Sequence, residues 1–207
     1  MNPTDETGIR SKRTDILTAA RNVFMRESYA KASMESIARE AGVSKQTVYN
    51  HFGSKEDLFR AIVQRRCEGL NAAFGEEFRY HGDEPGRLLT VFGERVLEIM
   101  LSKETMELHR LLQAEGRRHP ELAEIFYRYG ADRTANQLAD YLAEQTQKGR
   151  LKVDDPRIAA EQFTTMLSGH LRLRHLLGIA PPPTPAERSR YVASAVNLFL
   201  DGVGAGT

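Results

Sequence analysis

The chain has 207 residues, of which 41% are hydrophobic and 28% charged, and its 29 Lys and Arg stand against 28 Asp and Glu. This composition supplies enough apolar side chains for a core, which excludes a wholly disordered chain, and the length fits one large domain or a small domain joined to a larger one. No stretch approaches the roughly 20 apolar residues needed to cross a bilayer, and the first residues lack a signal peptide's apolar run, so we expect a cytoplasmic protein without membrane contact.

Apolar residues recur at helical spacing along nearly the whole chain, and no stretch shows the sustained alternation of a strand. The sequence therefore predicts an all-α protein. A first helix is expected over about residues 12–27, and a short second helix starts near Met34 after a capping Ser33. Gly42 is placed to end that second helix, and Ser44 to cap a third short helix.

The fourth helix is expected to be long, from Lys55 to about residue 80. Its buried side would carry Leu58, Phe59, Ile62, Leu70, Phe74 and Phe78. A Gly- and Pro-containing break at residues 81–86 is expected to link two units. Further helices are expected at residues 87–101, 103–118, 120–147, 156–177 and 185–203. The predicted organisation is a small head over residues 1–54 and a larger helical bundle over residues 55–207.

The strongest motif in the sequence is Ala38, Gly42 and Val48, at offsets of four and six. Two helices that cross steeply need a small residue at their contact, a glycine where the backbone reverses and an apolar residue to bury, which is the helix-turn-helix arrangement. The second helix of the motif would then point Lys45, Gln46, Thr47, Tyr49 and Asn50 outward, where they can reach a DNA major groove.

The charge of the N-terminal region agrees with that interpretation. Residues 10–52 hold eight Lys and Arg against four Asp and Glu, although the whole chain is nearly neutral. A local basic excess is compatible with a module that faces phosphates.

Residues 13–61 resemble the N-terminal domain of the TetR family of bacterial transcription regulators. The resemblance rests on Ile16, Ala19, Ala20, Phe24, Ser33, Ile37, Ala38, Ala41, Gly42, Val43, Ser44, Val48, Tyr49, His51, Phe52, Lys55, Glu56 and Leu58. Residues 110–122 and 153–163 resemble one subgroup of the family's ligand domains. The resemblance implies a homodimer whose paired third helices enter successive major grooves of a near-palindromic operator.

The resemblance also implies which positions contact double-stranded DNA: Lys45, Gln46, Tyr49, Asn50 and His51. Gln46 and Asn50 are suited to read bases, because a carboxamide can bond adenine through two hydrogen bonds. Tyr49, Lys45 and Lys55 are expected to bond phosphates.

The hydroxyls of Ser33 and Ser44, at helix N-termini, could also bond phosphates. Tyr49 and His51 have an alternative role as partly buried braces of the head. A basic arm of Arg10, Lys12 and Arg13 could reach a minor groove or remain a solvated tail.

In the family, a small molecule that enters the C-terminal bundle shifts the fourth helix and changes the spacing of the DNA-reading heads. Candidate contacts for such an apolar or aromatic effector are Phe92, His109, Phe126, Tyr127, Phe163, Met166 and His170, with plain core packing as the alternative for each. The last two helices are expected to form the dimer interface. Candidate interface residues are Leu167, Leu171, Tyr191, Val192, Ala195, Val196 and Phe199, with intrachain core as the alternative.

An enzyme is the rival class, but its motifs are missing from the sequence: there is no His-Glu-x-x-His, no Gly-x-Ser-x-Gly and no strand before a Gly-rich loop. We therefore expect neither catalysis nor a metal or cofactor, and we interpret the Gly-rich end at residues 202–206 as a frayed tail. The lone Cys67 is either inert or a redox switch. The resemblance implies a ligand-released repressor, because repression is the commoner outcome in the family; the alternatives are an activator, a DNA-binding protein without effector, and a fold used only for protein contacts.

Overall fold

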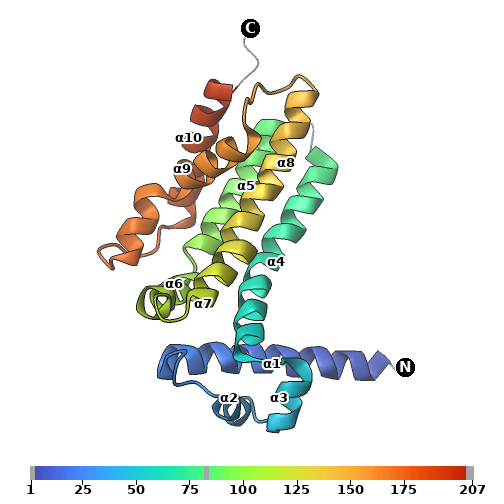
Figure 1. The fold of residues 1–207 in the computed structure, drawn as a ribbon. Helices are drawn as coiled ribbons and strands as arrows, with labels where there is room; N and C mark the ends of the chain where they lie inside the picture. Colours follow the sequence, from blue (N-terminus) through green and yellow to red (C-terminus); the bar gives the residue numbers. More distant parts are fainter. Residues whose placement is uncertain (1–2, 82–83, 204–207) are drawn as a thin grey trace. The chain divides into compact units, whose positions relative to one another are not determined.

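The computed structural model describes residues 3–81 and 84–203, with the side chains of residues 12–68 and 84–202. Within these ranges the chain is helical and has no β-strand, as predicted (Figure 1). The chain divides into two compact units, one from Met1–Arg65 with Glu107–Gly130, the other from Arg66–Met106 with Ala131–Thr207. None of the described helices is both long and apolar enough to cross a membrane. The predicted roles of Leu70, Phe74, Phe78, the Arg10 side chain and residues 204–206 fall outside these described parts.

The first unit, called the head below, contains the first three helices that the sequence predicts. It comprises α1 (Pro3–Glu27), α2 (Met34–Glu40), α3 (Lys45–His51) and the start of α4 (Lys55–His81), together with most of α6 (Lys103–Glu115), α7 (Pro120–Phe126) and part of a π-helix, η1 (Tyr127–Asp132). Helix α1 begins earlier than the predicted residue 12, at Pro3. Proline is tolerated in the first turn of a helix because its missing N–H has no partner there.

The head has one core, built by apolar side chains from every one of its helices. Its most buried members include Ile16, Phe24, Tyr29, Ile37, Val48, Leu58, Phe59, Leu108 and Leu122. Helix α1 packs on α2, and α2 on α3. Helices α2 and α3 have seven residues each, too short to be stable alone, so this shared core is what holds them.

The second unit, called the bundle below, is built by α5 (Pro85–Met100), α8 (Arg133–Gln147), α9 (Pro156–Leu176) and α10 (Pro185–Val203). Helix α8 packs against α9, and α5 packs against both α9 and α10 (Figure 1). The core includes Leu88, Leu89, Phe92, Leu97, Leu138, Tyr141, Leu142, Phe163, Leu167 and Val192. Gly93 permits this close packing, because a Cβ there would lie 2.9 Å from Val192 Cγ1 and 3.1 Å from Leu167 Cδ2.

Two of the predicted long helices are interrupted. The predicted helix over residues 120–147 is α7, η1 and α8 in succession, and Gly130 lies inside the π-helical segment. Helix α9 is kinked at Gly169, whose φ of 21° and ψ of −124° are far from helical values and are tolerated by glycine. The apolar periodicity continues through both interruptions, which is why the sequence pattern alone predicted straight helices.

The packing also divides the chain differently from the predicted boundary after residue 54. Helix α4 continues from the head into the bundle after Arg65, and α6 crosses at Met106 and Glu107. Residues 107–130 belong to the head because Leu108, Leu111, Leu122 and Ile125 complete its core. Such a contact between distant segments leaves no trace in local periodicity.

Candidate nucleic-acid interface

The helix-turn-helix of the head is formed by α2, a tight turn and α3. Ser33 caps α2: its hydroxyl accepts from the backbone N–H of Ser36 at 3.0 Å, and the Ser36 hydroxyl accepts from the N–H of Ser33 at 3.1 Å. Gly42 reverses the chain with a φ of 65°, and the N–H of Val43 returns to the carbonyl of Ala38 at 3.1 Å. This turn confirms the cap-and-glycine pattern that the sequence predicts.

Ser44 begins α3 as the predicted cap, with its hydroxyl accepting from the backbone N–H of Thr47 at 3.1 Å. Val48 is fully buried and anchors α3 to the core, while Phe52 follows the helix and is also buried. One face of α3 is thereby fixed inward, and the opposite face points to solvent.

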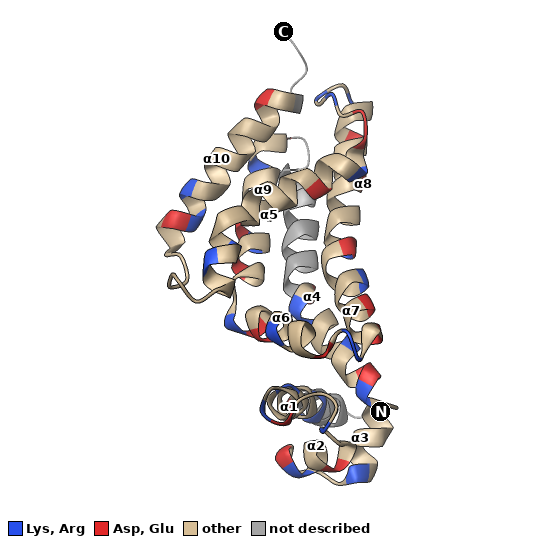
Figure 2. Cartoon of the chain, turned by 60° about the vertical axis from the view of Figure 1, so that its left-hand side comes forward, with Lys and Arg blue, Asp and Glu red and all other residues tan. Residues whose placement is uncertain are grey.

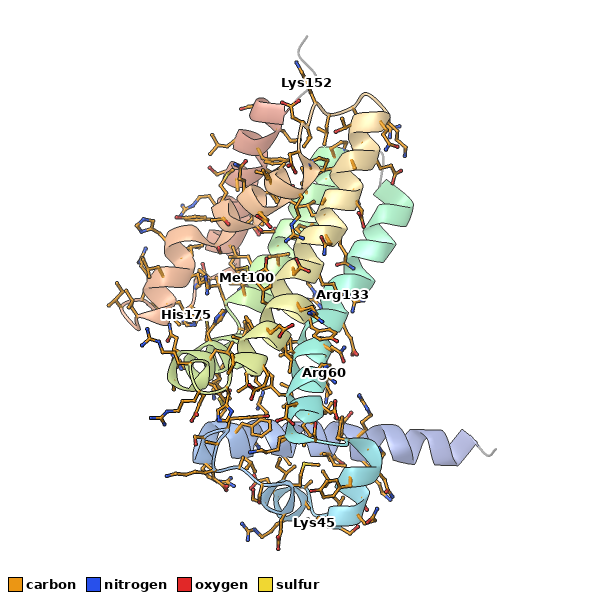
Figure 3. All side chains as sticks on the ribbon, viewed as in Figure 1. Lys45, Arg60, Met100, Arg133, Lys152 and His175 are labelled. Carbon is orange, nitrogen blue, oxygen red and sulfur yellow. The ribbon has the colours of Figure 1, made fainter. Side chains whose placement is uncertain are left out.

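The exposed face of α3 carries the predicted DNA contacts. Lys45, Gln46, Tyr49 and Asn50 are exposed, whereas Thr47 and His51 are half-buried. Figure 3 shows Lys45 where α2 and α3 come together, and its Nζ lies 4.0 Å from Glu35 Oε2. Tyr49 keeps 44% of its surface exposed, which is unusual for an aromatic side chain with a bracing role.

Several of these side chains are already hydrogen-bonded to one another. Gln46 Nε2 donates to Asn50 Oδ1 at 2.9 Å, and the hydroxyls of Ser44 and Thr47 are 2.8 Å apart. His51 lies next to the ring of Phe52, with 6.3 Å between ring centroids, so it contacts the edge of the core. The exposed face is thus polar and partly preorganised.

The predicted basic arm is not a tail over the residues whose side chains are described. Lys12 and Arg13 belong to α1, and the guanidinium of Arg13 lies 5.1 Å from the centroid of the Phe52 ring, a cation–π distance. Helix α2 carries both acidic and basic residues, which the colours of Figure 2 mark, whereas α3 has Lys45 and no acidic residue. The basic bias of the sequence is therefore distributed over the head and does not form a single patch on α3.

Lys55 has a role inside the head that the sequence did not predict. Its Nζ donates to the backbone carbonyls of Tyr29 at 3.0 Å and Ala32 at 2.9 Å, and it lies 4.7 Å from the centroid of the Tyr29 ring. Two of its three N–H donors are thus directed at the turn between α1 and α2. This geometry disfavours the predicted phosphate contact, because a lysine released to DNA would leave both carbonyls without this donor.

Tyr29 is the centre of an aromatic cluster that sequence reasoning missed. Its buried ring meets His119 edge-on at 5.1 Å and Phe59 at 6.2 Å. Burial raises the pKa of the Tyr29 phenol, and the neighbouring Glu56 carboxylate raises it further. The cluster ties the start of α7 to the turn between α1 and α2, and no signal in the sequence links residues 29 and 119.

The predicted effector contacts are divided between the two units. Phe92 and Phe163 lie in the core of the bundle, with ring centroids 6.5 Å apart. His109 and Phe126 belong to the head, where their rings meet at 4.8 Å, and Tyr127 is an exposed residue of that same unit. Met166 and His170 are exposed on α9. Three of these candidates therefore belong to the head and four to the bundle, because residues 107–130 fold with the head; contact of any of them with an effector stays a prediction.

A buried polar side chain on α8 is a better polar candidate for an effector site. Gln145 has no exposed surface, and its Nε2 finds no hydrogen-bond partner in the described part of the chain, while its Oε1 accepts from Arg150 at 3.2 Å. A buried donor without a partner costs folding free energy, and a ligand that accepts its hydrogen bond would remove that cost. The sequence did not single out Gln145, because the helical spacing of apolar residues does not show that a polar residue of the same helix is buried.

Most of the predicted dimer-interface residues are intrachain core. Leu167, Val192, Ala195, Val196 and Phe199 are buried within the bundle, Leu171 packs against that core, and only Tyr191 is substantially exposed. The exposed apolar surface of α9 and α10 instead includes Ile158, Met166 and Leu198, which are 51%, 37% and 64% exposed. A depression of about 480 Å³ on this side of α9 is lined by Ile158, Glu161, Gln162, Thr165 and Met166.

Cys67 is half-buried near the start of the bundle. Burial raises the pKa of its thiol, although Arg133 and Arg66 oppose this effect. A thiol with a raised pKa is a poor nucleophile at neutral pH, which favours the inert role over the redox switch. Among the described side chains, no group of His, Cys, Asp and Glu could hold a metal ion.

Comparison with known proteins gives two family matches. Residues 16–62 match the family described as bacterial regulatory proteins, tetR family, and residues 87–202 match the C-terminal domain of AefR-like transcriptional repressors. The regulator UidR of Escherichia coli is 31% identical over 156 residues, covering 72% of this chain and 74% of UidR. The transcriptional activator FasR of Mycolicibacterium smegmatis is 39% identical over 77 residues, which cover 37% of this chain and 35% of FasR.

Solved structures extend the similarity over nearly the whole chain. A TetR-family transcriptional regulator from Mesorhizobium loti has a TM-score of 0.79 at 28% identity, covering 95% of this chain and 98% of that one. The flavonoid-responsive regulator FrrA has a TM-score of 0.76 at 28% identity, covering 95% and 99%. Both matches include the head and the bundle.

Proposed function

Because the chain belongs to the TetR family of transcription regulators, and is therefore a DNA-binding regulator and not an enzyme, we propose that it is a homodimeric repressor. In this proposal α3 binds the major groove of each half of a near-palindromic operator, and a small molecule bound in the bundle releases the DNA. A protein that must reach bacterial operator DNA works in the cytoplasm.

The single observation that supports this proposal is that α3 exposes a polar face while its opposite side is held in the core of the head. Val48 is fully buried, while Lys45, Gln46, Tyr49 and Asn50 are exposed along one side of the same helix. A major groove is about 12 Å wide and admits a helix. The side chains offer donors and acceptors for both bases and phosphates.

The experiment that tests the proposal is selection of bound genomic fragments by the purified full-length protein at one near-physiological salt concentration. The expected result is a near-palindromic site in a promoter region, with half-sites about one helical turn apart or a multiple of it. Titration of that fragment should show affinity that falls steeply with salt, because phosphate contacts release counterions. Enrichment of no sequence above scrambled DNA, by protein that mass spectrometry shows to be ligand-free, would contradict the proposal.

The homodimer is supported by the apolar surface of α9 and α10. Residues 191–200 of α10 contain no Lys, Arg, Asp or Glu, and this stretch of the helix is uncharged in Figure 2. Leu198 and Ile158 are more than half exposed. An exposed apolar surface of this kind is typical of a contact with another protein, and two copies of a symmetric regulator supply it to each other.

The effector is proposed to be an apolar or aromatic molecule that carries a hydrogen-bonding group. The bundle core offers aromatic side chains such as Phe92 and Phe163, and Gln145 offers a buried donor. The structural relative FrrA is described as flavonoid-responsive, which fits a planar aromatic effector. A panel of flavonoids and related phenols is therefore the first set to titrate against the protein–operator complex.

Two alternatives keep the same fold. FasR is an activator, so an operator placed upstream of a promoter, with expression lost on deletion of the regulator, would favour activation here. Operator affinity unchanged by every bundle-binding compound would favour a regulator without an effector. Expression of the neighbouring genes in a deletion strain separates repression from activation directly.

A further inference from the structure

Gln46 and Asn50 are the two exposed carboxamides of α3, and they lie one helical turn apart. Gln46 Nε2 donates to Asn50 Oδ1 at 2.9 Å. The other polar side chains at the start of α3 have different partners: Thr47 meets the Ser44 hydroxyl, and Lys45 faces Glu35. The pair is thus an independent unit on the face of α3 that is directed outward.

The hydrogen bond fixes which groups each amide can still offer to DNA. Gln46 retains its Oε1 acceptor and its second Nε2–H, which together match the N6 donor and N7 acceptor of adenine. Asn50 turns its Oδ1 toward Gln46, using one of that oxygen's two lone pairs, and this bond leaves both of its Nδ2–H donors unused. These donors match N7 and O6 of guanine, O4 of thymine or N7 of adenine, and do not match the N4 amino group of cytosine.

The spacing of the pair fits neighbouring base pairs. Side chains one turn apart on a helix are separated by about 5 to 6 Å between Cβ atoms, and base pairs rise by about 3.4 Å, so the two amides span one or two base-pair steps. The pair can therefore specify two neighbouring base pairs in each half-site.

We infer that Gln46 and Asn50 read each half-site as one hydrogen-bonded pair, in which Gln46 selects adenine and Asn50 discriminates against cytosine at a neighbouring position. This inference rests on the proposed function. Each amide orients the other before DNA arrives, so less side-chain freedom is lost on binding than for two independent long side chains. Removal of either amide then releases the other, and the two contacts are lost together.

The test uses the full-length protein and a duplex library with randomised half-sites, so that no operator need be known beforehand. Wild type, Gln46→Ala, Asn50→Ala and the double variant are compared by selection and by titration on the selected site and on its single-base changes. Lys45→Ala is the matched control, because it removes an exposed side chain of α3 that is expected to touch phosphate. Thermal unfolding of every variant checks that the head remains folded.

Each single variant is expected to lose at least about 5- to 150-fold in affinity for the selected site, which is the range for one good bidentate base contact, because both contacts are lost together. The double variant should lose about as much as one single variant, and both singles should relax preference at the same two positions. Losses that multiply in the double variant, preferences that relax at separate positions, or no loss in either single variant would overturn the inference.

Asn50→Asp provides a second, sharper variant. It retains the acceptor for Gln46 and replaces the two donors toward DNA with an acceptor. Adenine preference at the Gln46 position should therefore persist, while preference at the neighbouring position moves to cytosine. If the adenine preference disappears instead, the hydrogen bond does not run from Gln46 to Asn50 and the pair is not the reading unit. Failure of the proposed function is distinct, because the wild-type protein would then select no site at all.

Discussion

At the scale of single residues, Tyr49 is expected to contact a phosphate, which positions the protein on DNA without specifying a base sequence. Its phenol is the largest exposed group on α3, and a hydroxyl in this place is suited to a phosphate. We expect Tyr49→Ala to cost about 1.5 to 3 kcal/mol in binding free energy, equally on the selected operator and on scrambled DNA. Fluorescence anisotropy titrations on both duplexes measure this, and a loss confined to one base step would assign Tyr49 to base reading.

Lys55 is expected to act on stability, because its Nζ bonds the carbonyls of Tyr29 and Ala32 and lies over the Tyr29 ring. Lys55→Met should lower the free energy of unfolding by about 1.5 to 3 kcal/mol, the cost of losing charged hydrogen bonds. Lys45→Met removes an equal charge from an exposed site and should change it by less than about 0.5 kcal/mol. Denaturant unfolding of both variants measures the two changes in free energy. Equal changes would contradict the structural role of Lys55.

Glu56 predicts a pH dependence of stability. A hydrogen bond from its own backbone N–H lowers the pKa of its carboxyl, with the Ser54 and Tyr29 hydroxyls acting in the same direction and burial opposing them. A lowered folded-state pKa means that the stabilisation is complete above the ordinary value of 4.5 and is lost as the pH falls through the lower folded value.

Glu56→Gln should therefore be less stable than wild type at pH 7 by about 0.3 to 1 kcal/mol, the usual effect of a carboxylate in a first helical turn. The difference should shrink as the pH falls below 4.5. Glu68→Gln, which removes a charge from an exposed position of α4, is the control. Unfolding curves at several pH values measure the difference, and a gap that stays constant down to acid pH would refute the assignment.

At the scale of helices, the contact of α5 with α9 and α10 depends on the absence of a side chain at Gly93. A Cβ would lie 2.9 Å from Val192 Cγ1, closer than real Cβ contacts allow. Gly93→Ala should therefore lower the free energy of unfolding by about 1 to 3 kcal/mol through overpacking, despite the better helix propensity of alanine.

Gly202→Ala is the matched control, since it lies in α10 with no atom within 4 Å of the added Cβ. It gains helix propensity without a clash and should be neutral or stabilising. Thermal and denaturant unfolding of the two variants compare these effects. A stabilised Gly93→Ala variant would show that α5 can move away from its neighbours without cost.

At the scale of the whole molecule, dimerisation should depend on the exposed residues of α9 and α10 and not on the buried ones. Ile158→Asp combined with Leu198→Asp should shift the chain to a monomer and weaken binding to a two-half-site operator, because avidity is lost. Tyr127→Asp, which changes a residue of the head with 55% exposure, is the control. Sedimentation velocity measures the oligomeric state; a double variant that remains dimeric would place the interface elsewhere.

The sequence by itself was sufficient for the all-α class, for the helix-turn-helix at residues 34–51 and for the caps Ser33 and Ser44. These features depend on interactions within a few residues: a hydroxyl bonded three positions on, a glycine with positive φ, and a buried residue at helical spacing. Each leaves a short and recognisable pattern, so the exposed face of α3 could also be predicted.

Only the tertiary structure decided where His109, Phe126 and Tyr127 belong, which part of α9 and α10 is exposed, and what Lys55 bonds. Helical periodicity tells which face of a helix is apolar, but it does not tell which other segment covers that face. The contact of Tyr29 with His119 joins positions ninety apart in the chain, and such contacts are chosen by the packing of the whole core rather than by any local pattern.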